Sequence, residues 1–458
     1  MNRAAAIAAA LVFFIVALFG AHNALKNNAF MGDFRAFYCA GDLARRGHFD
    51  YSLERIAPCE SSSAPRGFLS ATPLLVVPAP LPGYVVAAFV PLSLLAYPLA
   101  SACWWGLLFG IAVVAAVLLA RLGWSTADAA IVALALPVGV VCMPPGELPP
   151  FALAGIVVAA TGVQRDLRWL RFAGFAIAAT QPQLALALAL AMLVVSPKTW
   201  REIAAVTVGL ALVSIGTIGF AENISYVWDF LPSHVAVEVH RVQQFTVSWA
   251  VAQLGASVTA ATWTGRIVYV IALTSAAFAA KRLAIVGEGG AACAVAVVFA
   301  LLGGPFVHQD HVVCAIPAAL WLASKRGGVP GITACVLLAL PVASIFANPI
   351  LVLTVAAFTF WLASSYGVSL RRSAYAALGA MIFAVGLAEL SVRMGLPFHA
   401  PANAAGDVWA RYVATNDIAG GALIWIVKAP VWIALTMVVV AALRLTTQRQ
   451  LAGSRRLR

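Results

Sequence analysis

Charged residues are scarce in this chain of 458 residues. Asp, Glu, Lys and Arg make up 10% of it, whereas ordinary soluble domains carry about 25%. Hydrophobic residues make up 63%, which is more apolar surface than a single soluble core of this size would bury. Uncharged stretches of about 20 residues or more recur from end to end. The sequence therefore predicts an all-α integral membrane protein and excludes disordered and nucleic-acid-binding proteins.

Several sequence motifs that are typical of well-known enzyme classes are also missing. The chain contains no Asp-x-Asp, no Gly-x4-Gly-Lys-Ser/Thr and no His-Glu-x-x-His. Their absence excludes the short metal–nucleotide motif of soluble-type sugar transferases, a P-loop ATPase and a zincin-type protease. No internal repeat is apparent, which weighs against the transporter folds that are built from inverted repeats.

Cysteine is sparse, with seven residues. Five of them lie in or beside apolar segments and are expected to be small buried residues: Cys103, Cys142, Cys293, Cys314 and Cys335. Cys39 and Cys59 share one polar segment. In an oxidising compartment they would be able to form a disulfide, and two free thiols are the alternative.

The apolar segments predict about 12 to 14 membrane segments in one polytopic domain, residues 1–458. They lie at roughly 4–25, 98–120, 126–143, 151–164, 203–220, 263–280, 289–304, 311–324, 329–347, 349–366, 373–394 and 421–443. Two further apolar regions are broken by proline. Residues 74–96 contain five prolines when Pro73 is included, and residues 172–196 are split at the Gln-Pro-Gln step of 181–183.

The distribution of charge predicts the orientation of the chain in the membrane. If 74–96 does not cross and 172–196 is a hairpin, 18 of the 29 basic residues but only 4 of the 17 acidic ones fall on one side. The positive-inside rule then puts both termini, and the basic tail at 444–458, in the cytoplasm. The plasma (inner) membrane is the expected location. Residues 26–72 become a long first outer loop, joined on that face by 144–150, 221–246, 305–310 and 395–420.

The first outer loop holds the densest chemistry of the sequence. Asp33 lies eight residues after Leu25, near the interface where a lipid-linked head group would lie. It is either a catalytic base or one member of a solvated, charge-balanced loop. An Asp in an outer loop with its ordinary pKa of about 3.9 would be ionised at neutral pH unless it is strongly buried.

This loop carries a resemblance to a known family. Residues 33–41, Asp-Phe-Arg-Ala-Phe-Tyr-Cys-Ala-Gly, followed by Gly-His-Phe-Asp-Tyr at 47–51, resemble the first-loop signature of glycosyltransferase family 87. Gln-Pro-Gln at 181–183 resembles the family's Lys-Pro-Gln step, and His-Gln-Asp-His at 308–311 resembles its late His-containing loop. The similarity runs in order over most of the chain. Two departures stand out: Gln181 replaces the lysine, and Glu147 follows Gly146 where the family tends to have Gln.

The resemblance implies a GT-C-like helical bundle and a sugar transfer at the outer leaflet. A hexose such as mannose would pass from a polyprenyl-phosphate donor to a lipid or glycan acceptor, with inversion and without a metal or other cofactor. Asp33 would be the general base. The residues expected to bind substrate are Arg35, Tyr38, Glu147, Gln181, Gln183, His308 and His311. The expected partners are the donor, the acceptor and membrane lipids, with no nucleic acid.

Positive charge or hydrogen-bond donors are needed where the leaving phosphate develops its charge. The outer-face candidates are Arg35, His308, His311, Arg393, Arg411 and Lys428. For His308 and His311 three interpretations stay open: contact with phosphate or sugar, part of a metal site, or polar structural residues at the interface. Glu147, a lone carboxylate at a membrane edge, is either a substrate contact or structural.

Two other functions remain alternatives to a glycosyltransferase. A transporter or flippase for a lipid or small solute would also place charged residues around a cavity. Such a protein should bury ionisable groups in the middle of its spans, whereas here these groups gather at one face. A purely structural membrane subunit would leave the dense first loop unexplained.

Overall fold

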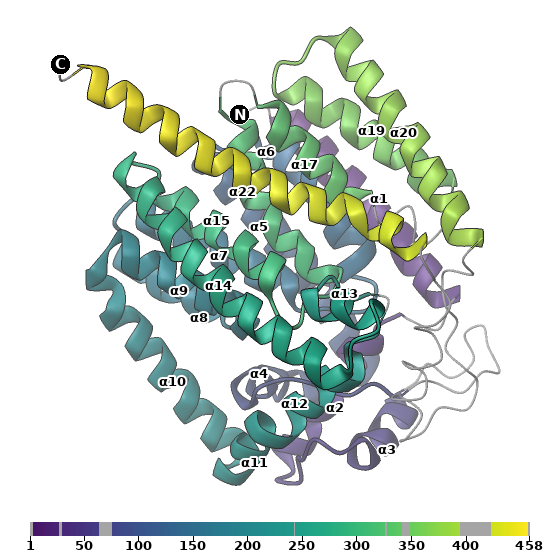
Figure 1. Cartoon of the computed structure of the whole chain (residues 1–458). Coiled ribbons are helices and arrows are strands. Elements are labelled where there is room, and N and C mark those ends of the chain that lie inside the picture. The colour runs from purple at the N-terminus through teal and green to yellow at the C-terminus, as the bar shows by residue number, and fades with distance from the viewer. Residues whose placement is uncertain are drawn as a thin grey trace.

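The chain folds almost entirely into helices (Figure 1). The computed structural model describes residues 3–26, 30–63, 76–241, 243–325, 328–340, 349–393 and 423–456. Within these ranges no strand forms, and the nearest approach to one is a single antiparallel bridge between Gln244 and His308. The expectation of an all-α membrane protein is therefore confirmed for the described part of the chain.

The elements follow the apolar segments of the sequence. The first half contains α1 (Arg3–Lys26), α2 (Gly32–Arg45), α3 (Leu53–Ser63), α4 (Gly83–Phe89), η1 (Leu92–Leu94), α5 (Tyr97–Arg121), α6 (Ala127–Leu136), η2 (Pro137–Cys142), α7 (Pro149–Gln164), α8 (Arg168–Ala178), α9 (Pro182–Val195), η3 (Pro197–Thr199) and α10 (Trp200–Ile218). The second half contains α11 (Phe220–Ser225), η4 (Tyr226–Phe230), α12 (Leu231–Glu238), α13 (Val247–Gln253), α14 (Val258–Ile285), α15 (Gly289–Gly303), η5 (Asp310–Ala315), α16 (Ile316–Ala323), α17 (Val329–Ala339), α19 (Pro349–Ser365), α20 (Leu370–Arg393) and α22 (Leu423–Arg456).

Six of these helices are long and apolar enough to cross a bilayer. They cover Arg3–Leu25, Tyr97–Arg121, Pro197–Ile218, Val258–Ile285, Leu370–Leu390 and Ile424–Gln448. Eight shorter apolar helices of 10–17 residues accompany them. Since a straight crossing takes about 20 residues, the count of 12 to 14 membrane segments stays a prediction.

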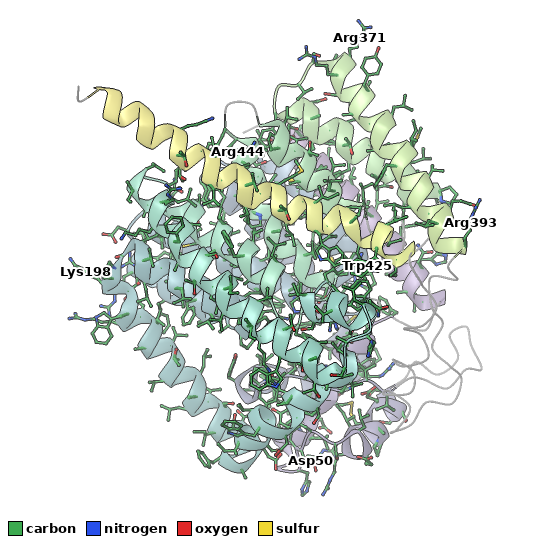
Figure 2. All side chains as sticks on the ribbon, in the orientation of Figure 1. Asp50, Lys198, Arg371, Arg393, Trp425 and Arg444 are labelled. Atoms are coloured by element: carbon green, nitrogen blue, oxygen red, sulfur yellow. A yellow bond between two sulfur atoms is a disulfide. The ribbon has the colours of Figure 1, made fainter. Side chains whose placement is uncertain are left out.

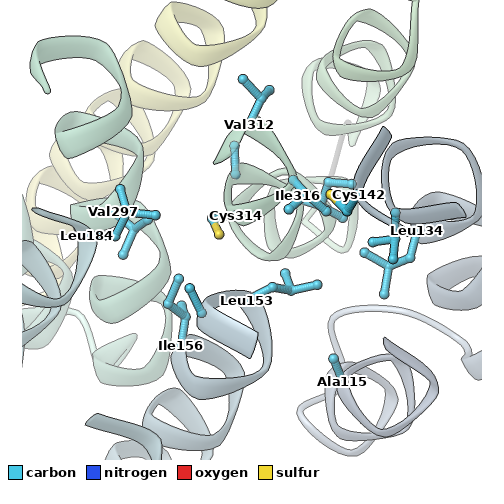
Figure 3. Close-up of a cluster of buried hydrophobic side chains, with 14 of the residues drawn as sticks. Ala115, Leu134, Cys142, Leu153, Ile156, Leu184, Val297, Val312, Cys314 and Ile316 are labelled. Carbon is cyan, nitrogen blue, oxygen red and sulfur yellow. The ribbon is translucent and has the colours of Figure 1, made fainter. Parts of the chain in front are cut away.

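The core lies where the short apolar helices meet the long ones. Figure 3 shows buried side chains from α5, α6, α7, α9, α15 and α16 converging, among them Leu134, Leu153 and Val297. Small residues let these helices approach closely. A Cβ added at Gly155 of α7 would lie 2.3 Å from the backbone nitrogen of Ala178 in α8, so this helix pair depends on glycine at that position.

Two segments differ from their predicted form, and a third takes a form that the sequence did not specify. The part of the first outer loop between residues 30 and 63 is mostly two helices, α2 and α3, and residues 64–72 lie outside the described ranges. The segment 221–246 is also largely helical, through α11, η4 and α12. The basic tail continues α22 as far as Arg456. For the two outer segments polar composition suggested a loop, but α2, α3 and α12 bury residues in the bundle, and this burial stabilises helices.

The proline breaks fall where the sequence placed them. Residues 172–196 form two helices, α8 and α9, separated at Ala179–Gln181. The region 74–96 contributes only the short α4 and the turn η1 among its described residues, which agrees with a segment that does not cross. Pro137 marks the change from α6 to the π-helical turn η2.

Cys39 of α2 and Cys59 of α3 form a disulfide, with their Cα atoms 5.7 Å apart. The bond ties together the two helices of the first outer segment. The other five cysteines are free thiols. The open question of whether these two cysteines pair is thus settled in favour of the bridge.

Thiol counting checks the bridge directly. After denaturation without reductant, five of the seven cysteines should react with a thiol reagent, and all seven after reduction. Replacing both Cys39 and Cys59 with Ser should lower the free energy of unfolding by about 3 kcal/mol, because the unfolded chain gains conformational entropy when a loop of this size is no longer closed. Cys103→Ser, which removes an exposed free thiol, is the matched control. Seven reactive thiols before reduction would contradict the bridge.

The labelled charged residues of Figure 2 separate into two groups. Lys198 lies at the left edge of the view, Arg444 above its centre and Arg371 at the top, whereas Asp50 lies at the bottom and Arg393 at the right edge. In Figure 1 the helices α2, α3, α11 and α12 gather at the lower end. The described helices of the predicted outer segments 26–72 and 221–246 therefore share one end of the fold.

Labelling of single cysteines tests which end faces outward. The exposed Cys103 is first removed, and a single cysteine is then introduced at an exposed position on each predicted face. Ser233 lies on the predicted outer face and Ser369 on the predicted cytoplasmic face. We expect Ser233→Cys to react with an impermeant thiol reagent in intact cells and Ser369→Cys to react only after lysis, as the charge distribution predicts. The reverse pattern would invert the topology.

Candidate active site

The N-terminus of α2 is fixed to the segment that precedes α7. The backbone N–H of Met31 donates to the carbonyl of Pro144 at 2.6 Å, and those of Asp33 and Phe34 donate to the carbonyl of Pro145 at 3.1 Å each. The first N–H groups of a helix have no partner within it, so they need external acceptors of this kind. This contact places Asp33, in the first turn of α2, beside residue 147.

Gly146 makes the close approach possible. Its φ is +87°, a conformation that favours glycine, and an added Cβ would lie 2.5 Å from the Cβ of Phe34. The indole Nε1 of Trp104 donates to the Gly146 carbonyl at 2.9 Å. The ring of Phe34 stacks on that of Trp104 with centroids 5.6 Å apart. Packing and hydrogen bonds therefore fix both sides of the Asp33–Glu147 contact.

Asp33 and Glu147 form a hydrogen-bonded pair of carboxyl groups. Both side chains are only partly exposed. Burial raises the pKa of Asp33, and a hydrogen bond from Glu147 partly opposes this rise. Burial and the charge of Asp33 raise the pKa of Glu147 well above its ordinary value. The exception for a buried Asp therefore applies to Asp33, because α2 packs into the bundle instead of forming a solvated loop.

His308 lies at the centre of a second polar group. Its Nε2 is 2.7 Å from Oε2 of Glu238 and 2.8 Å from Nε2 of Gln244. The Gln244 side-chain oxygen in turn accepts from the backbone N–H of Val307 at 3.2 Å. The bridge between residues 244 and 308 aligns the two segments, so the position of His308 is set by backbone as well as side-chain contacts.

Glu238, at the end of α12, is 1% exposed and contacts Arg241, His234 and His308. Arg241 Nη1 lies 2.9 Å from one of its carboxylate oxygens and 3.2 Å from the other. Burial opposes ionisation, but the charges of Arg241 and His308 outweigh it and hold the pKa of Glu238 below its usual range. Burial lowers the pKa of the neighbouring His234 to about 4, so this ring is neutral at pH 7.

His311 is buried, at 3% exposure, and belongs to the wall of the site. Its Nδ1 lies 3.2 Å from the backbone nitrogen of His308 and 3.3 Å from Oδ1 of Asp310, and its Nε2 lies 2.9 Å from Oε1 of Gln181. The same oxygen accepts from Nε2 of Gln183 at 3.0 Å. These contacts bring the 181–183 step and the late His segment together, as two halves of one polar wall.

The two groups lie close enough to act on each other electrostatically. Arg241 and His308 favour the ionised form of Asp33, and Asp310 opposes it. Five of the predicted site residues besides Asp33 are thus in one region: Glu147, Gln181, Gln183, His308 and His311.

Arg35 and Tyr38, which were also expected to bind substrate, contact residues outside this region. Arg35 is 2% exposed, and its Nε lies 3.2 Å from Oε2 of Glu60 in α3. The Tyr38 hydroxyl donates to the carbonyl of Leu95 at 2.9 Å. The structure therefore places these two side chains where they hold α2 against its neighbours.

The other candidate cations lie in different places. Lys428 of α22 is buried, at 1% exposure. Its ammonium contacts the carbonyl of Gln244 and lies 4.0 Å from the centre of the Trp249 ring. Arg393 is exposed on α20 and pairs with Glu389 at 3.1 Å. Arg411 lies outside the described residues.

Sequence reasoning missed Glu238, Arg241 and Gln244. The available signal was weak: a Glu and an Arg three residues apart in the outer segment 221–246, a spacing that is common on helix surfaces. Only the fold shows that this segment meets His308. Within the described ranges, no three His, Cys, Asp or Glu side chains are arranged to hold a metal ion.

Comparison with protein-family models, with curated proteins and with solved structures finds no match to this chain.

Proposed function

We propose that this protein is a membrane glycosyltransferase that moves a hexose from a polyprenyl-phosphate donor to a lipid or glycan acceptor, with Asp33 as the base. The observation that carries the proposal is the gathering of Asp33, Glu147, Gln181 and His308 in one region from four distant parts of the chain. Asp33 and His308 lie in the strings that resemble glycosyltransferase family 87, and Gln181 and Glu147 lie at two positions where the sequence departs from that pattern.

The chemistry needs a base and a stabilised leaving group. Asp33 takes the proton of the acceptor hydroxyl while the acceptor oxygen attacks the anomeric carbon. The bond from that carbon to the phosphate oxygen breaks, and its electron pair leaves with the lipid phosphate. Attack from the opposite face inverts the anomeric centre. Burial of Asp33 makes it a stronger base than a solvated Asp, because it raises the pKa of the carboxyl group.

Arg241 and His308 act electrostatically on the base and suit the leaving phosphate, Arg241 as a cation and His308 as a hydrogen-bond donor. Gln181 brings a neutral amide to the position where the family has lysine, so Arg241 supplies the positive charge that this substitution removes. Glu238 holds both Arg241 and His308 by direct contacts, at 2.9 and 2.7 Å. A preorganised pair of donors of this kind stabilises the charge that develops on the leaving oxygen.

The disulfide between Cys39 and Cys59 supports an outward-facing site. Disulfides persist in oxidising compartments and are rare in the cytosol. This bond joins the helix that carries Asp33 to α3. It agrees with the orientation that the charge distribution predicts, in which the site faces the outer leaflet of the plasma membrane and both termini are cytoplasmic.

A reconstituted transfer assay tests the proposal. Purified protein in vesicles of total membrane lipid is incubated with a small panel of polyprenyl-phosphate sugars, and products are identified by mass spectrometry. A new glycosylated product that requires both protein and donor is expected. Absence of product with every donor, from protein that is folded by its melting curve, would count against a glycosyltransferase.

A transporter or flippase is the second candidate, and one observation favours it. Lys428 is buried near the start of the long apolar helix α22, where an ammonium group is costly and can be part of a substrate pathway. The same vesicles separate the two functions. Movement of a fluorescent polyprenyl-phosphate sugar between leaflets, without any change in its mass, would favour transport.

A further inference from the structure

We propose that Glu147 is the positioning residue for the base: it keeps one proton that it shares with Asp33, and so holds the Asp33 carboxylate ionised and correctly aimed. The inference rests on the proposed function for its catalytic meaning. The carboxyl pair itself does not depend on that function, and this allows the two to be tested separately.

The geometry holds the two carboxyl groups together. Pro144 and Pro145 offer their carbonyls to the N-terminus of α2, in bonds of 2.6 and 3.1 Å, and the Gly146 carbonyl accepts from Trp104 at 2.9 Å. Because these bonds lie immediately before Glu147, and two of them end on Asp33 and its neighbour, the backbones on both sides are fixed. These bonds hold residues 33 and 147 beside each other, and the hydrogen bond between the two carboxyl groups then fixes their side chains.

A hydrogen bond between two carboxyl groups requires one proton. Ionised carboxylates only accept hydrogen bonds, so one partner must be protonated to donate. Two carboxylates at one buried site do not both ionise readily, since their charges repel. Asp33 and Glu147 are therefore a pair that titrates together, with one proton over a wide range of pH.

The groups around Asp33 and Glu147 do not change the conclusion that the pair keeps one proton. The charged and titratable groups that act on the pair come from several neighbouring elements: Arg241 after α12, His308 before η5, Asp310 in η5, Glu60 in α3 and Cys142 in η2. The first two favour ionisation and the two carboxyl groups oppose it. The neighbouring charges of opposite sign partly cancel in their effect on the two pKa values. Burial is the largest influence, and it favours a pair that carries a single negative charge.

The proton belongs mainly to Glu147. Burial and the Asp33 charge raise the pKa of Glu147 well above the ordinary value of 4.5, whereas the hydrogen bond from Glu147 acts to lower the pKa of Asp33. One oxygen of Asp33 then accepts this bond, and the other is left to take the proton of the acceptor hydroxyl. After transfer Asp33 carries that proton, which passes to water, while the Glu147 proton stays in place.

Activity and stability should both depend on pH through this pair. Below the pKa of Asp33 both groups are protonated, and the base is lost. Above the raised pKa of Glu147 both are ionised, and the aligning hydrogen bond is lost. The folded pKa of Glu147 is above its unfolded value, so its contribution to stability is complete below about pH 4.5 and declines as pH rises.

The test compares wild type, Glu147→Gln and Glu147→Ala. The amide of Gln keeps a donor that does not titrate, whereas Ala removes it. We expect Glu147→Ala to lower kcat roughly 10–10²-fold with little change in KM, as a misaligned base would. Glu147→Gln should lose less and should not show the alkaline decline of kcat that wild type shows. Exposed Glu54→Gln is the matched control and should keep the wild-type profile.

A second readout does not need activity. Between about pH 5 and about pH 8 the melting temperature of wild type should fall more steeply than that of Glu147→Gln, because only wild type has the shifted Glu147. Equal slopes, or an unchanged alkaline limb in Glu147→Gln, would overturn the proposal. A wild type that transfers no sugar but shows the expected difference in slope would reject the glycosyltransferase and keep the carboxyl pair.

Discussion

Replacing Asp33 with Asn should lower the rate of sugar transfer by about 10²–10⁴-fold, the usual contribution of a positioned base. Asn keeps the shape of the side chain and can still accept a hydrogen bond from Glu147, but it cannot take up a proton. The backbone bond from residue 33 to Pro145 is unaffected by the change. Expression and melting temperature should therefore stay close to those of wild type, so that the loss is confined to kcat.

Asp42→Asn is the matched control in the same helix. Asp42 pairs with Arg45 and Arg46 in exposed contacts of 2.5 and 2.9 Å, and exposed pairs of this kind contribute little. Its transfer rate should stay within about threefold of wild type. Near-normal turnover by a well-folded Asp33→Asn protein would assign the base to another residue and remove the main support for the proposed function.

Gly146→Ala should lower both stability and turnover, because two constraints meet at this position. The positive φ of +87° costs an alanine about 1–3 kcal/mol. The new Cβ would also lie 2.5 Å from that of Phe34, which is fully buried and cannot move aside. The N-terminus of α2 must then shift, and Asp33 with it. A displacement of about 1 Å can reduce turnover roughly 10²-fold.

Gly367→Ala separates the two constraints. Gly367 has a similar φ of +77°, but an added Cβ there would meet nothing within 4 Å. It lies between α19 and α20, at the opposite end of the fold from α2 (Figure 1). We expect it to lower the melting temperature through backbone strain and to leave kcat unchanged. If both glycine variants reduce kcat equally, the effect is general destabilisation and not displacement of Asp33.

The sequence alone determined the class of the protein and its long helices. Segments predicted at 4–25, 98–120 and 263–280 correspond to α1, α5 and α14, because a run of about 20 apolar residues satisfies its own backbone hydrogen bonds only as a helix. Asp33 and the 181–183 step were also found from sequence, through local strings that resemble a family signature. Local patterns of this kind depend on residues that are close along the chain.

The tertiary structure decided what those residues contact. Asp33 meets Glu147 only because three backbone bonds and a glycine dock α2 onto the segment before α7. Arg35 contacts Glu60 in α3. His308 contacts Glu238, which lies in a segment that the sequence predicted to be a loop. Pairings between distant segments depend on how helices pack, and burial then shifts the pKa of each carboxyl group, so neither could be inferred from residue order.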